Sequence, residues 1–86
     1  MIKTENGSIL KDINIVLQFR VSKEVDWSVL IESRVSGNYY VANNTTRWSL
    51  YNAIESTDTC IIVTPIETNE AWLLLEQSAM GVLLKD

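Results

Sequence analysis

Hydrophobic and polar side chains alternate with a period of two through residues 13–21. The apolar positions of this stretch are Ile13, Ile15, Leu17, Phe19 and Val21. Successive side chains of a strand point to opposite faces of its sheet, so the pattern predicts a half-buried strand with these residues on one face.

Two more strands are predicted beyond the polar turn at residues 22–26. The apolar positions of residues 27–35 fit a strand face and a helical face nearly equally, and their β-branched and aromatic content favours the strand. Gly37 marks a turn, and residues 39–42 follow as the next strand. Because short connections favour antiparallel neighbours, these strands are predicted to form a meander. Near the start of the chain, Asn6-Gly7 is a hairpin signal.

Two helices and a buried strand are predicted in the second half of the chain. Residues 43–46 (NNTT) can cap the first turn of a helix over about 46–56. Residues 59–64 (TCIIVT) are typical of a strand buried on both faces, in which Cys60 packs as a small hydrophobic side chain. A second helix is predicted over about 66–80, starting at a capping box in residues 64–67 or, alternatively, at Thr68 or Asn69. Residues 82–86 either continue this helix or form a short strand.

The predicted fold is a small single α+β domain over residues 1–86. Its sheet is mainly antiparallel, with a meander of about three strands and the buried strand at 59–64, and both helices lie on one face. A chain of 86 residues has room for one core and not for two.

The net charge narrows the class of partner. The chain has 7 Lys and Arg against 11 Asp and Glu, a net charge of −4. Its cations are scattered along the sequence, which argues against direct nucleic-acid binding, and an acidic surface favours a basic partner. The sequence contains no apolar run long enough for a membrane span, no signal peptide and one cysteine. We therefore expect a cytoplasmic protein without membrane association.

Most catalytic chemistry is excluded by residues that the chain lacks. It has no histidine, and so neither the commonest general base nor a Ser-His or Cys-His pair. One cysteine cannot supply a thiolate zinc site, and no phosphate-binding glycine motif occurs. Carboxylate pairs such as Glu24 with Asp26 lie in polar turns or at helix ends, where solvated surface explains them. We therefore expect a protein that is not an enzyme and uses neither metal nor cofactor.

Aromatic side chains near residue 48 exceed what a core needs. On a helical wheel at about 100° per residue, the core side of the first helix comprises Leu50, Tyr51, Ala53 and Ile54. Trp48 falls opposite them, which predicts an exposed binding anchor unless it folds back over the preceding loop. Two tyrosines are adjacent in a strand, so one must point away from the face of the other. The predicted partner-binding residues are Trp48, Tyr39, Tyr40, Asn52 and Glu55.

The second helix is apolar on two sides. Its core face is predicted to contain Ala71, Trp72, Leu75, Ala79, Val82 and Leu83. A second stripe contains Ile66, Leu73, Met80 and Leu84. A helix that is apolar on two sides must be covered on both, so this stripe predicts a dimer or partner face.

These observations favour a non-catalytic, acidic protein-binding module. The leading hypothesis is an inhibitor, antitoxin-like or immunity-type accessory protein that blocks a larger, basic partner, such as a nucleic-acid-binding protein. The first alternative is a structural or assembly subunit that acts as a homodimer through its C-terminal helix. The second is a small-ligand-binding or enzyme domain, which requires a concave pocket containing a buried polar group.

Overall fold

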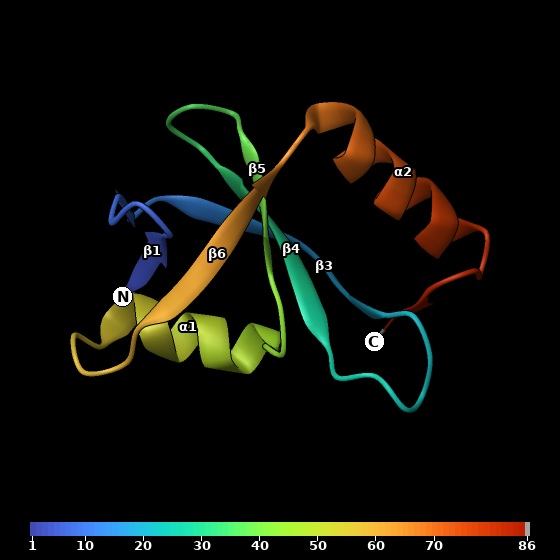
Figure 1. Cartoon of the computed structure of the whole chain (residues 1–86), viewed down its shortest axis with the longest axis horizontal. Coiled ribbons are helices and arrows are strands. Elements are labelled where there is room, and N and C mark those ends of the chain that lie inside the picture. Colours follow the sequence, from blue (N-terminus) through green and yellow to red (C-terminus); the bar gives the residue numbers. More distant parts are fainter. Residues whose placement is uncertain (86) are drawn as a thin grey trace.

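The computed structural model describes residues 1–85, which form a curled sheet of seven strands and two helices (Figure 1). In chain order the elements are β1 (Ile2–Thr4), β2 (Ile9–Leu10), β3 (Ile13–Arg20), β4 (Ser28–Ser33), β5 (Tyr39–Ala42), α1 (Arg47–Glu55), β6 (Ile61–Ile66), α2 (Thr68–Ala79) and β7 (Leu84–Lys85). The strands are arranged in the order β2-β1-β6-β5-β4-β3-β7. β1 and β6 run parallel, and every other pair of neighbours is antiparallel.

The predicted meander is the middle of a larger, mixed sheet. β3, β4 and β5 are consecutive antiparallel neighbours, and the Asn6-Gly7 turn joins β1 to β2 with Gly7 at a φ of 91°. The sequence did not predict that β1 pairs in parallel with β6, where Ile2 lies opposite Ile61. β1 has 3 residues and β2 has 2, which is too short for a recognisable alternation. The prediction of a mainly antiparallel sheet of about three strands plus one is corrected accordingly.

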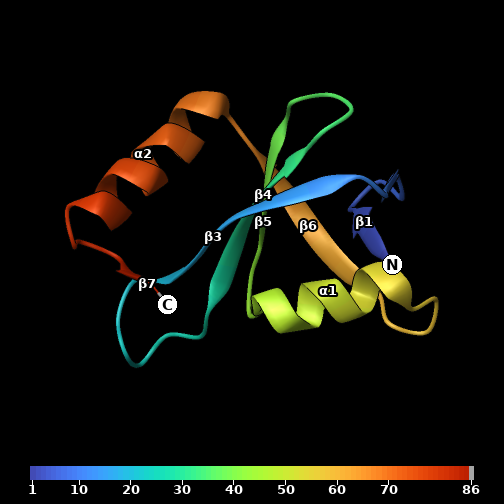
Figure 2. The ribbon, with the colours of Figure 1, turned by 180° about the vertical axis from the view of Figure 1, so that it is seen from behind.

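The two helices lie on opposite faces of the sheet, which corrects the prediction that both cover one face (Figures 1 and 2). Leu50 of α1 packs in one cluster, here called the α1-side core, and Ala71 of α2 packs in another, the α2-side core. β4 explains why both faces are covered. Val29 and Ile31 belong to the α1-side core and Leu30 to the α2-side core, and all three are fully buried. A strand that is apolar at consecutive positions is stable only between two layers.

A β-bulge turns the two halves of β3 toward different faces. The register with β4 shifts between Ile15 and Leu17, so Val16 is an extra residue. The first isoleucines of β3 pack in the α1-side core, whereas Leu17 and Phe19 pack in the α2-side core. The prediction that the apolar positions from Ile13 to Val21 share one face is therefore wrong. Val21 lies beyond the end of β3 and is exposed.

The N-terminal end of α1 is held by two side chains. Gln18 of β3 is 6% exposed, and its Oε1 accepts a hydrogen bond from the backbone N–H of Arg47 at 2.8 Å. Thr46 is the N-cap, and its Oγ1 accepts from the backbone N–H of Ser49 at 3.2 Å. A helix leaves its first N–H groups without intrahelical acceptors, so these two contacts fix where α1 begins.

Replacing Gln18 by leucine is expected to lower the free energy of unfolding by about 1 to 3 kcal/mol, because the N–H of Arg47 loses a buried acceptor. Urea denaturation followed by circular dichroism measures the change. Thr46→Ser keeps a hydroxyl at the N-cap and is the matched control, with little expected loss. A loss of less than about 0.5 kcal/mol for Gln18→Leu contradicts the prediction, because water would then replace the amide.

α2 begins at Thr68, with Glu67 as its N-cap, so the later of the two predicted starts is correct. Pro65 is a residue of β6 and not the first position of a helix. β1 pairs with β6 only as far as Val63, so within residues 1–85 one edge of β6 has no paired strand at the proline. Proline is tolerated at such edges because it lacks the N–H that a paired strand needs. No helix within these residues has the length and hydrophobicity needed to cross a bilayer.

β6 is displaced from the predicted buried strand at 59–64. It spans Ile61–Ile66, and Cys60 precedes it and is exposed, which corrects the prediction that this thiol packs in the core. Ile62 is also exposed, so β6 is not buried on both faces along its whole length. Within residues 82–86, a short strand was the correct alternative, because Leu84 and Lys85 form β7 beside β3. The last predicted residue of this segment lies outside the described residues.

Candidate protein-binding surface

The solvent side of α1 presents two large aromatic side chains. Trp48 is 74% exposed and Tyr51, one turn further on, is 60% exposed. Asn52 and Glu55 are exposed beside them, and these four residues are here called the α1 outer face. Of the two alternatives that the sequence left open for Trp48, the exposed one is correct.

Tyr51 and Ile54 were predicted to face the core, and both are exposed instead. The fully buried side chains of α1 are Leu50 and Ala53. The buried part of α1 is therefore a narrow strip, and the large side chains beside it remain exposed.

The two adjacent tyrosines do not join the α1 outer face. Tyr39 packs against the α2-side core and Tyr40 against the α1-side core, so they point to opposite faces as predicted. Both are half-buried, because each face of β5 is covered. Tyr40 also lines two shallow hollows, one beside the β1–β2 turn and one beside the β4–β5 turn, and neither is lined by α1. The predicted cluster of Trp48 with a tyrosine of β5 is therefore not assembled.

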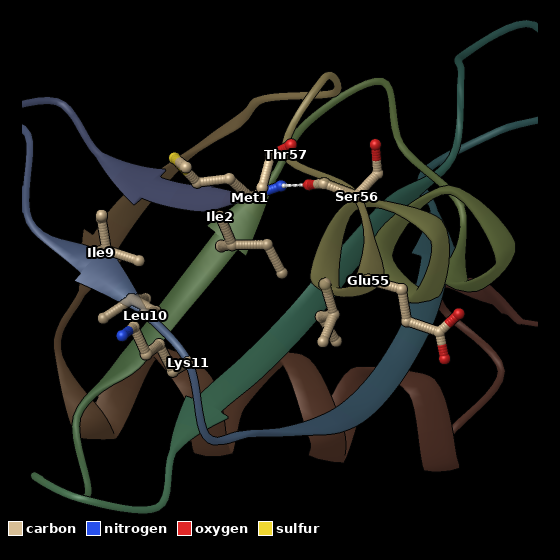
Figure 3. Close-up of a pocket in the computed structure, with 9 residues that line it drawn as sticks. Met1, Ile2, Ile9, Leu10, Lys11, Glu55, Ser56 and Thr57 are labelled. Carbon is tan, nitrogen blue, oxygen red and sulfur yellow. Dashed lines mark hydrogen bonds between the residues drawn. The ribbon is translucent and has the colours of Figure 1, made fainter.

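An apolar groove adjoins the α1 outer face at the C-terminal end of the helix (Figure 3). Its volume is about 450 Å³, and its apolar lining comprises Met1, Ile2, Ile9, Leu10 and Ile54. Figure 3 shows the β2 side chains on one side of the groove and the end of α1 on the other. The backbone nitrogen of Met1, which precedes β1, donates a hydrogen bond to the carbonyl oxygen of Ser56 at 2.8 Å. Sequence patterns did not reveal this groove, because it joins residues far apart along the chain.

The chemistry of this surface suits contact with another protein. Tryptophan and tyrosine are enriched among the residues that dominate interface energetics, and an adjoining apolar groove can receive a side chain of a partner. Glu55 and Lys11 are the charged residues of the groove lining. No group of three or more potential metal-ligating side chains was found in residues 1–85.

The third tryptophan, Trp27, contacts a side chain of its own domain. Trp27 is half-buried, and the guanidinium carbon of Arg20 lies 4.4 Å from its ring centroid, within the range of a cation–π contact. The two exposed tryptophans are therefore Trp48 on α1 and Trp72 on α2.

The predicted stripe on the second helix is divided among several elements. Leu73 is exposed on the solvent side of α2, and Met80, the C-cap of this helix, is also exposed. Ile66 lies in β6 and packs against the α2-side core, and Leu84 lies in β7. Three residues predicted for the core face of this helix are exposed, and they are Trp72, Ala79 and Val82. The solvent side of α2 is therefore more apolar than predicted.

No protein-family model, curated protein or solved structure matches this chain. The fold and its exposed side chains define the class: a small α+β domain that presents apolar and aromatic residues on both of its helices. Function must be inferred from these surfaces and from the charge of the chain.

Proposed function

We propose that this protein is a non-catalytic, acidic protein-binding module that blocks a larger, basic partner in the cytoplasm. The inhibitors, antitoxin-like proteins and immunity-type accessory proteins act in this way. The observation that carries the proposal is the exposure of Trp48 and Tyr51, 74% and 60%, on the same side of α1. Side chains of this size are rarely left in water together unless they form an interface.

The attachment of α1 to the sheet supports this role. Thr46 and Gln18 hold its first turn, and Leu50 anchors it in the α1-side core. An anchor residue on a rigid helix loses less conformational entropy on binding than one on a mobile loop. The backbone at Trp48 is thus held in place before any partner arrives.

The charge of the chain supports a basic partner. With a net charge of −4, it is attracted over long range to a cationic surface, which raises the rate of association. A nucleic-acid-binding protein is one class of basic partner, because its phosphate-binding site is a cationic surface that an acidic domain can cover.

Affinity capture from cells of the native source, with wild type and Trp48→Ala, tests the proposal. A captured basic protein is expected to bind Trp48→Ala at least about tenfold more weakly, because the variant loses its largest exposed aromatic side chain. Val35→Ala is the control, since it truncates an apolar side chain that is 85% exposed in the turn between β4 and β5, outside both helices. If Trp48→Ala binds the captured protein as well as wild type does, the anchor assignment is wrong. If the captured partner is acidic, the proposed partner class is wrong.

A homodimeric assembly subunit is the second candidate function. The observation in its favour is the exposure of Leu73 and Met80, seven positions apart on α2. Two copies that meet through this side of α2 would bring Glu70 and Glu76 of one copy near those of the other, which weakens the candidate. Sedimentation equilibrium decides it, because a protein that remains monomeric at high micromolar concentration is not a dimeric subunit.

A further inference from the structure

α2 packs its small side chains inward and leaves its large ones in solvent. It meets the sheet through Ala71 and Ser78, which are both buried. Trp72, Leu73 and Met80 are 60%, 52% and 69% exposed. At about 100° per residue these three side chains share an arc of the helix with Glu76. These four residues are here called the α2 outer face: Trp72, Leu73, Glu76 and Met80.

The charged residues of the segment that contains the α2 outer face are all acidic, and the next cation along the chain is Lys85 of β7. Residues 67–84 contain Glu67, Glu70 and Glu76 and no lysine or arginine. Glu67 and Glu70 lie at the N-terminal end of α2, where the helix dipole stabilises a carboxylate. Glu76 lies near the C-terminal end of α2, where the helix dipole disfavours a carboxylate. The last turn of α2 contains no basic residue.

Glu76 has no salt bridge within residues 1–85. Among residues 1–85 the detected salt bridge joins Arg34 to Asp12, both remote in sequence from α2. Glu76 is exposed to solvent in the isolated domain, where its carboxylate opposes the helix dipole and lies between exposed apolar side chains. A cation from another molecule would offset this unfavourable position.

We propose that the α2 outer face is a docking surface for a basic amphipathic helix of another protein. Apolar side chains of that helix pack against Leu73 and Met80. A lysine or arginine beside them pairs with the carboxylate of Glu76 and lies over the ring of Trp72. With 12 residues, α2 is about 18 Å long, which matches three turns of a partner helix.

The charge pattern selects this occupant over a second copy of the chain. Self-pairing would place an acidic segment without cations against itself, whereas a basic helix is complementary to it. The surface is also distinct from the one in the proposed function, because the sheet lies between α1 and α2 (Figures 1 and 2). Contact with Trp48 therefore does not by itself cover the α2 outer face.

A synthetic amphipathic helical peptide of leucine and lysine, of about 18 residues, is the probe that tests the proposal. The chain has 3 tryptophans, so their indole N–H resonances report separately in nuclear magnetic resonance spectra. We expect saturable shifts of the Trp72 resonance and none of Trp48. A peptide with glutamate in place of lysine is expected to leave both unchanged. This measurement requires no captured partner, so its outcome is independent of the Trp48→Ala experiment.

Glu76→Gln is expected to weaken binding of the leucine–lysine peptide about five- to tenfold, through loss of a charge-assisted contact. The urea denaturation midpoint of the Glu76→Gln variant should not fall, because Glu76 has no stabilising role in the free domain. Glu24→Gln makes the same charge change in the exposed turn after β3 and should bind the peptide as wild type does. Equal weakening by both variants, shifts at Trp48 in place of Trp72, or absence of saturable binding overturns the proposal. A peptide-free dimer that Met80→Lys abolishes also overturns it, because the occupant is then a second copy.

Discussion

Leu50→Ala is expected to lower the free energy of unfolding by about 3 to 4 kcal/mol. Leu50 is fully buried and is the large side chain through which α1 enters the α1-side core; the other fully buried residue of the helix, Ala53, offers a single methyl group. Truncation removes the buried methyl groups and leaves a cavity between α1 and the sheet. Urea denaturation followed by circular dichroism gives the change directly.

Ile54→Ala is the matched control for this loss. It truncates a branched aliphatic side chain in the same helix at a position that is 41% exposed, so a loss below about 1 kcal/mol is expected. Hydrogen exchange gives a second measurement, because amides of α1 should exchange faster in Leu50→Ala than in Ile54→Ala. Similar losses of stability in the two variants would show that α1 is not anchored through Leu50.

Leu30→Ala is expected to cost about 3 to 4 kcal/mol on the other face of the sheet. Leu30 is fully buried in the α2-side core, where it lies opposite Leu17 of β3. α2 itself contributes mainly the small Ala71 and the half-buried Leu74 and Leu75, so this core consists largely of strand side chains, of which Leu30 is the most buried. The loss of stability is measured by urea denaturation, as for Leu50→Ala.

Leu74→Ala, at a half-buried position of α2, is the control and is expected to lose less than Leu30→Ala. The double variant Leu30→Ala with Leu50→Ala adds a sharper test. The two leucines belong to different cores, so their losses should add to within about 0.5 kcal/mol. A strong departure from additivity would mean that the sheet transmits repacking from one face to the other.

The sequence predicted the central strands well and their faces poorly. Alternation located β3 because a period of two persists along most of it. The bulge at Val16 reversed the face of the residues that follow, and the only local signal was three consecutive apolar residues, Ile15, Val16 and Leu17. Such a run also fits a strand buried on both faces, so the sequence pattern could not separate the two. For the same reason the sequence did not show that both faces of the sheet are apolar, and the prediction that both helices lie on one face was wrong.

The candidate surfaces were predictable only where a side chain lies far from the buried strip of its helix. Trp48 is opposite that strip on a wheel, so the angle indicated exposure, although its place in the first turn also allowed the side chain to fold back over the preceding loop. Tyr51 and Trp72 lie near the boundary, where exposure depends on how closely the helix approaches the sheet. That distance is set by small residues such as Ala53 and Ala71, which the wheel counts as apolar without regard to size.

The parallel pairing of β1 with β6 links the start of the chain to a segment near its end. During synthesis β1 emerges first, but its neighbour in the sheet includes Ile61 and is made much later. An isolated hairpin of β1 and β2 is too small to be stable, and the closure of a long loop is slow. Residues 2–4 therefore lack their β6 neighbour on the ribosome until residues 61–63 have been made. The order of translation thus delays the completion of this edge of the sheet.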